Sequence, residues 1–169
     1  PINHLLYCLG YEDSIQYMTI NVNEQLIIKN LIDKYSPGPL TFLVKASDLV
    51  PKYLLGDNKY IAIQISKNKI LRDLIQYSNG PICASSANII NKTCSTSLEH
   101  IYKYFEHIDV DIIDDNNYIC EFGIESTIIK IDNTNLSIFR YGTILEDDIN
   151  SFVIDFNTKD INAFNINFI

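Results

Sequence analysis

The fold class of this chain is decided by the stretch Glu125-Ser126-Thr127-Ile128-Ile129-Lys130-Ile131-Asp132-Asn133-Thr134-Asn135-Leu136-Ser137-Ile138-Phe139-Arg140. It predicts two strands, 125–131 and 136–140, joined by the turn residues 132–135. Because a hairpin pairs its strands antiparallel, the sheet cannot be purely parallel. Predicted strands and helices alternate along the rest of the chain. We therefore expect an α/β (α+β mixed) fold, a twisted mixed sheet with flanking helices.

The other elements are predicted from hydrophobic spacing and turn residues. A helix is expected over 24–35, capped by Asn23 and stopped by Ser36-Pro37-Gly38-Pro39. Further helices are expected at 68–77 and 97–105, with a short helical turn within 47–55. Strands are expected at 4–9, 40–45, 60–65, 81–84 and 110–113, and the strand 81–84 is expected to be buried. The C-terminal tail, 145–169, is too weakly patterned for its structure to be predicted.

Composition predicts one globular domain with little affinity for nucleic acid. The 169 residues can bury a real core, and 47% hydrophobic with 20% charged residues is an ordinary globular balance. The net charge of −8 opposes contact with a phosphate backbone. The sequence has neither a signal peptide nor an apolar run of about 18 residues, which predicts a cytoplasmic protein with no membrane association.

The residue types that most often bind metals are scattered along the chain. The four cysteines lie far apart without a C-x-x-C pair, and the three histidines share no ligand spacing. We therefore expect no metal site in the protein and free, buried thiols. These residues are Cys8, Cys83, Cys94, Cys120, His4, His100 and His107.

Three segments place small, polar or cationic residues where strands begin or end. In 83–88 an apolar strand changes to small polar residues, which lets a ligand approach the backbone among uncharged donors and acceptors. Ser126-Thr127 repeats this pattern, and Arg140 with Gly142 suits a bidentate phosphate contact. Each segment alone is equally compatible with an ordinary strand end, or with a surface salt bridge for Arg140.

Together the segments resemble the YrdC-type threonylcarbamoyl-adenylate synthase family, which carries Pro-Gly-Pro-Leu-Thr, Ser-Ala-Asn, Ser-Thr and Arg-x-Gly in this order. Here these motifs are 37–41, 86–88, 126–127 and 140–142. The resemblance implies a YrdC/RibB-like fold with a concave cavity, in a single domain over residues 1–169. The family's Lys-x-Arg cluster and an earlier Thr would precede Pro1, so the domain is expected to lack its N-terminal part.

The resemblance also implies roles for individual residues. The structural corner near the site is Pro37, Gly38 and Thr41. The expected threonine-binding residues are Gln64, Ala84 and Ser126. The expected nucleotide-binding residues are Tyr60, Ser86, Asn88, Cys94 and Arg140. It assigns no catalytic residue.

The implied activity is that of an L-threonylcarbamoyladenylate synthase. Such an enzyme makes threonylcarbamoyl-AMP and pyrophosphate from L-threonine, bicarbonate and ATP, for tRNA threonylcarbamoyladenosine modification. ATP is then a substrate, Mg²⁺ the expected cofactor, and a tRNA threonylcarbamoyl transferase complex the downstream partner, with direct tRNA binding weak or absent. Attack of a carbamate on the α-phosphate needs no covalent enzyme intermediate, so catalysis is expected from positioning and charge neutralisation.

Two departures from the family pattern leave another interpretation open. Gln64 stands where the family's strand usually has the Arg of Arg-x-Pro, and Ile90-Asn91 replaces the usual Ser-Gly. Glutamine brings no charge to a carboxylate, and charge-assisted hydrogen bonds are roughly twice as strong as neutral ones. The alternative is a YciO-like or degenerate paralogue that binds nucleotide or RNA without synthase activity. A carbamoyl-transfer module of the hydrogenase-maturation type is a weaker alternative, because this sequence carries none of the accompanying zinc-finger and acylphosphatase segments.

Overall fold

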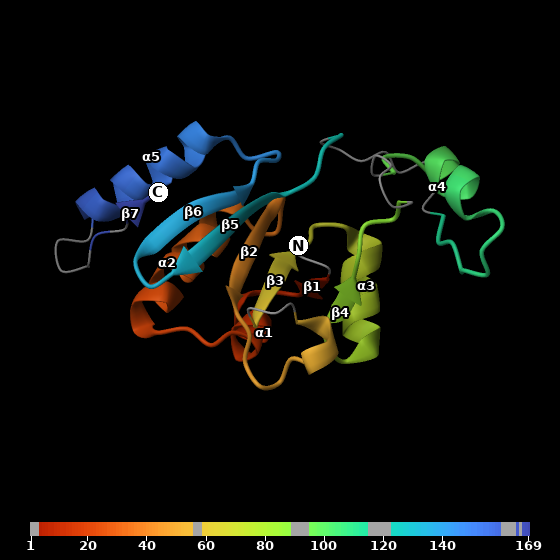
Figure 1. The fold of residues 1–169 in the computed structure, drawn as a ribbon, viewed down its shortest axis with the longest axis horizontal. Helices are drawn as coiled ribbons and strands as arrows, with labels where there is room; N and C mark the ends of the chain where they lie inside the picture. Colours follow the sequence, from red (N-terminus) through yellow and green to blue (C-terminus); the bar gives the residue numbers. More distant parts are fainter. Residues whose placement is uncertain (1–3, 56–58, 89–94, 115–122, 160–164, 166) are drawn as a thin grey trace. The chain divides into compact units, whose positions relative to one another are not determined.

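A mixed sheet organises the described part of the chain, with seven strands in the spatial order β4-β1-β3-β2-β5-β6-β7 (Figure 1). This computed structural model describes residues 4–55, 59–88, 95–114, 123–159, 165 and 167–169. Pairing is antiparallel for β4/β1, β3/β2 and β5/β6 and parallel for β1/β3, β2/β5 and β6/β7. The predicted mixed sheet is therefore confirmed. The strands are Leu5–Cys8 (β1), Leu40–Lys45 (β2), Tyr60–Ile65 (β3), Ile82–Ala84 (β4), Thr127–Asp132 (β5), Asn135–Arg140 (β6) and Asn167–Phe168 (β7).

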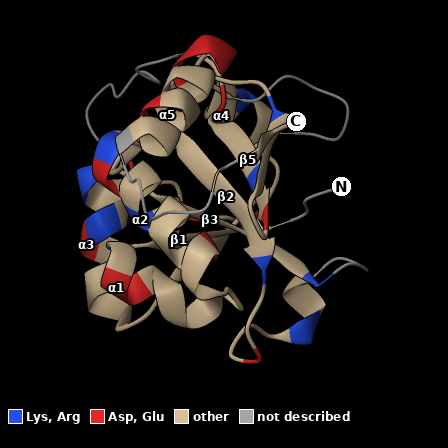
Figure 2. Cartoon of the chain, turned by 90° about the vertical axis from the view of Figure 1, so that its left-hand side faces the viewer, with Lys and Arg blue, Asp and Glu red and all other residues tan. Residues whose placement is uncertain are grey.

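Helices α2 and α5 cover one face of this sheet, and Figure 2 shows them side by side. Ile27 and Leu31 of α2 and Phe152 of α5 share one buried cluster with Phe42 and Ile63 of the sheet. Helix α3 contacts β1 and β4. The helices are Tyr11–Ser14 (α1), Val22–Tyr35 (α2), Lys69–Ser78 (α3), Leu98–Phe105 (α4) and Glu146–Lys159 (α5), with 3₁₀ turns at Ile15–Tyr17 (η1) and Lys52–Leu54 (η2).

The chain divides into two compact units. The larger unit comprises Pro1–Ala84 with Ser126–Ile169 and contains the sheet, and the smaller unit comprises Ser85–Glu125 and contains α4. A single domain over 1–169 stays a prediction. Among the helices that the structure describes, none has both the length and the apolar character that a bilayer crossing requires.

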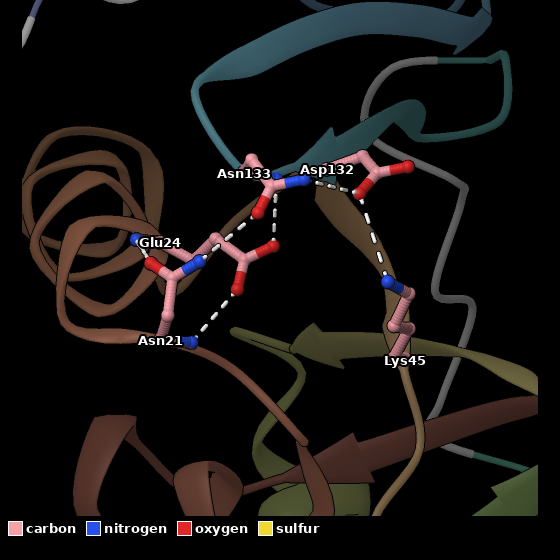
Figure 3. A network of polar contacts seen from close by, with 5 residues as sticks. All are labelled: Asn21, Glu24, Lys45, Asp132 and Asn133. Carbon is pink, nitrogen blue, oxygen red and sulfur yellow. Dashed lines mark hydrogen bonds and ion pairs between the residues drawn. The ribbon is translucent and has the colours of Figure 1, made fainter.

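Helix α2 begins earlier than predicted, and its cap is Asn21 rather than Asn23 (Figure 3). The Asn21 side chain accepts a hydrogen bond from the backbone N–H of Glu24 at 2.9 Å. The Glu24 carboxylate accepts one in return from the backbone N–H of Asn21 at 2.8 Å. The prediction of Asn23 was wrong because this reciprocal capping box needs an acid three residues after the cap, and Glu24 lies three residues after Asn21.

Glu24 also joins the start of α2 to the β5–β6 hairpin turn (Figure 3). Its second carboxylate oxygen accepts a hydrogen bond from the backbone N–H of Asn133 at 2.8 Å. Asn133 adopts a left-handed conformation, φ 56°, which asparagine tolerates better than most residues. Glu24 is only 7% exposed. One carboxylate therefore fixes a helix end and a strand turn that are far apart in the sequence.

Replacing Glu24 with Ala should lower the free energy of unfolding by about 2 kcal/mol, because two backbone N–H groups lose their acceptor. Asn21 and Asn133 are exposed, so water can replace part of that loss. Urea denaturation of the variant measures the effect. The matched control is Asp33→Ala, which removes an exposed carboxylate paired with Lys29 on the same helix. Equal stability of the two variants would contradict the bridging role of Glu24.

Several predicted elements need correction. Residues 110–113 form no strand, because β-branched residues alone do not make a strand without a pairing partner. Val110 and Ile113 are 49% and 60% exposed. Cys83 is exposed rather than buried because β4 lies at the edge of the sheet. Cys8 is buried as expected, and this burial raises the pKa of its thiol to about 12.

The C-terminal tail contains a helix and a strand that were not predicted. Helix α5 buries Ile149, Phe152, Val153 and Phe156 against the sheet. Its first turn carries Glu146, Asp147 and Asp148, acidic residues that suit the positive end of a helix dipole. Strand β7 then extends the sheet beside β6. The tail thus completes one end of the core.

Candidate functional site

Four polar side chains meet on the second face of the sheet, opposite α2 and α5. They are Gln64, Thr41, Ser126 and Arg140, here called the polar row. Gln64 on β3 and Thr41 on β2 are direct register partners. Alternation along the strands turns their neighbours Ile63 and Phe42 toward the helices instead. The strand register therefore gathers residues that lie far apart in the sequence.

Hydrogen bonds run through the polar row in one direction. Thr41 Oγ1 donates to Gln64 Oε1 at 3.2 Å and lies 2.8 Å from Ser126 Oγ. Because a hydroxyl has one hydrogen to donate, Ser126 Oγ must be the donor to Thr41. Ser126 Oγ in turn accepts from Arg140 Nη2 at 3.1 Å. The Arg140 guanidinium, the first donor in this series of hydrogen bonds, thus polarises both hydroxyls.

A β-bulge turns Arg140 toward this face. Ile129 pairs with Ile138, but the next pair is Ile128 with Arg140, so Phe139 is an extra residue in β6. Without it, Arg140 would face the core side beside Thr127. Bulges re-aim side chains in this way. From its position Arg140 donates twice to the Ser126 carbonyl, through Nε at 3.2 Å and Nη2 at 2.9 Å.

The predicted corner is hydrogen-bonded to the row through Gly38. Gln64 Nε2 donates to the Gly38 carbonyl at 3.0 Å, and the Gly38 N–H donates to the Ile65 carbonyl at 2.9 Å. A Cβ at Gly38 would lie 2.5 Å from the Tyr35 carbonyl oxygen, so only glycine fits. The corner follows a cis peptide bond between Ser36 and Pro37. Gln64 therefore uses its oxygen and one amide hydrogen within the protein.

The remaining predicted site residues are not members of the row. Tyr60 and Gln64 are on the same face of β3, and Lys130 Nζ lies 4.9 Å from the centre of the Tyr60 ring. Ala84 pairs with Leu5 at the edge strand β4. Ser86 and Asn88 belong to the smaller unit, where the Asn88 N–H donates to the Ser86 carbonyl at 3.1 Å. Cys94 lies outside the described residues.

Sequence reasoning missed Tyr7, which lies directly beside the polar row. On β1 it is the register partner of Gln64. The sequence Leu5–Cys8 is apolar throughout, so neither the alternating burial of this strand nor its neighbour β3 can be read from it. Within the described residues, no group of three His, Cys, Asp or Glu side chains gathers to hold a metal ion.

The chain is similar to several known proteins. A family model for Sua5, YciO and YrdC proteins, described as "Telomere recombination", matches residues 4–142. The threonylcarbamoyl-AMP synthase of Pyrococcus abyssi is 31% identical, over 89% of this chain and 43% of that protein. The putative threonylcarbamoyl-AMP synthase of Methanocaldococcus jannaschii is 32% identical, over 70% of this chain and 54% of that protein.

The solved structure of Pyrococcus abyssi Sua5 in complex with L-threonine has a TM-score of 0.77 and 25% identity, over 99% of this chain and 46% of that chain. The chain thus spans about half the length of the curated relatives it matches. The family model covers most of its residues. The chain therefore belongs to the Sua5/YciO/YrdC family.

Proposed function

We propose that this chain carries the substrate site of an L-threonylcarbamoyladenylate synthase. The polar row is the observation that carries the proposal, because its hydroxyls and guanidinium suit a small polar substrate beside a phosphate group. Two comparisons support the same choice. The relatives are named threonylcarbamoyl-AMP synthases, and a structural neighbour was solved in complex with L-threonine.

In the proposed reaction the neutral amine of L-threonine condenses with bicarbonate to give a carbamate and water. A carbamate oxygen then attacks the α-phosphorus of ATP, and the bond to the β-phosphate breaks to release pyrophosphate. Arg140 neutralises phosphate charge, while Ser126, Gln64 and Ala84 border the threonine. Because positioning and charge stabilisation suffice for this step, no nucleophilic side chain is assigned.

The nucleotide in this proposal is also bordered by Tyr60, Ser86, Asn88 and Cys94. Mg²⁺ would enter with ATP, because the ion binds mainly substrate phosphates and water in such enzymes. It would supply further neutralisation of phosphate charge. A tRNA threonylcarbamoyl transferase complex would consume the product in the cytoplasm, a compartment that the free thiols of Cys8 and Cys83 support.

The test is to mix the complete protein with ATP, bicarbonate and Mg²⁺ and to measure pyrophosphate. Release should depend on L-threonine and should fall to background without it. Release that is independent of threonine, or no release at all, would overturn the proposal.

One observation favours a second candidate, a YciO-like protein that binds nucleotide without this reaction. The neutral amide of Gln64 is already bonded to Thr41 and Gly38, which leaves less of it for a carboxylate. Calorimetry separates the two functions. If ATP binds but threonine binds neither alone nor with ATP, the second candidate is correct.

A further inference from the structure

Tyr7 lies beside Gln64, at the β3 end of the polar row. It is the register partner of Gln64, and in-register residues of neighbouring strands share a face of the sheet. Its neighbour on the same face of β1, Leu5, pairs with Ala84. Tyr7 therefore lies beside Gln64, while Ala84 pairs two residues away along β1, and both are proposed to border threonine.

Arg140 and Tyr7 lie toward opposite ends of the row. They stand on β6 and β1, four strand steps or about 19 Å apart at the backbone. Burial raises the pKa of the Tyr7 phenol, and the positive charge of Arg140 opposes part of this rise.

Tyr7 offers a donor at a point where the row has few. Gln64 has committed its oxygen and one amide hydrogen, and the Thr41 hydroxyl donates to Gln64. The Tyr7 hydroxyl makes no hydrogen bond to any residue that the structure describes. A half-buried phenol that stays protonated is a good donor to an anionic oxygen.

We propose that Tyr7 is a specificity residue whose hydroxyl donates a hydrogen bond to the carboxylate of the amino-acid substrate. The inference rests on the proposed function and deepens it. Tyr7 takes over part of the task that Gln64, a neutral residue, performs less strongly than an arginine would. The ligand class is an α-amino acid with a free carboxylate.

The test compares Tyr7→Phe with the unmodified protein by calorimetry, in the presence of a non-hydrolysable ATP analogue. The Kd for L-threonine should rise about 10-fold, the size expected for one hydrogen bond to a charged group. The Kd for the ATP analogue should change less than about twofold. The control is Tyr77→Phe, which removes a hydroxyl from a side chain on α3 that is 88% exposed.

L-threoninamide, which lacks the carboxylate, distinguishes recognition from a structural effect. The unmodified protein should bind it more weakly than L-threonine, and Tyr7→Phe should cause no further loss. Equal loss for both ligands would make Tyr7 structural, and an unchanged threonine Kd would also overturn the inference. A protein that binds no threonine even without the substitution would instead overturn the proposed function, and the role of Tyr7 with it.

Discussion

Arg140→Ala should reduce threonine-dependent pyrophosphate release about 100-fold, the loss typical of removing one preorganised donor from a developing charge. The guanidinium is the cation of the polar row, and it also holds the Ser126 carbonyl through two hydrogen bonds. ATP binding should weaken more than threonine binding, because in the proposed function the lost charge would neutralise the phosphates. Initial rates and calorimetry with each ligand measure the two effects.

Arg140→Lys separates charge from geometry. Lysine keeps the positive charge but cannot donate two hydrogen bonds from one planar group to the Ser126 carbonyl. We therefore expect it to recover only part of the activity. Lys29→Ala is the control for net charge, because it removes a cation from α2, where no residue of the row lies. Equal weakening of ATP and threonine binding in Arg140→Ala would show that Arg140 is structural.

Much of the fold was predictable because its strands are strongly patterned. The strands 40–45 and 60–65 match β2 and β3 to the residue, and the hairpin from 125 to 140 is confirmed within two residues. These segments combine β-branched residues with clear turn signals on each side. Helices α3 and α4 are confirmed within one residue at each end, with Asn68 and Ser97 as their caps.

The helix α5 was missed although its signal was present. Ile149, Phe152, Val153 and Phe156 follow the i, i+3, i+4, i+7 spacing of a buried helix face. The strand 110–113 shows the opposite error, since local composition predicted an element that finds no partner among the described residues. Local pattern decides an element only where tertiary packing agrees with it.

The members of the polar row were predictable from the sequence but their geometry was not, and their role in binding stays a prediction. Gln64, Ser126 and Arg140 were named from the sequence, yet their contacts depend on strand register. Register between strands that lie far apart in the sequence is set by core packing rather than by any local motif. The bulge at Phe139 could not be predicted from the sequence either, although the direction of the Arg140 side chain depends on it.

Thr127 anchors the chain next to the site, and its hydroxyl is fully buried. Thr127 Oγ1 donates to the Ile144 carbonyl at 2.8 Å and accepts from the Ile144 N–H at 2.9 Å. This pair ties the start of β5 to the residues that lead into α5. Both backbone groups of Ile144 depend on one side chain.

Thr127→Val keeps the shape of the side chain and removes both hydrogen bonds. The free energy of unfolding should fall by about 3 kcal/mol, because a buried donor and a buried acceptor are left unsatisfied. Thr127→Ser keeps the hydroxyl and loses one methyl group, so it should cost only about 1 kcal/mol. Urea denaturation of the two variants measures the difference. If valine is no worse than serine, the Ile144 pair does not stabilise the fold, and the position of Ser126 must be fixed by Arg140 and Thr41 alone.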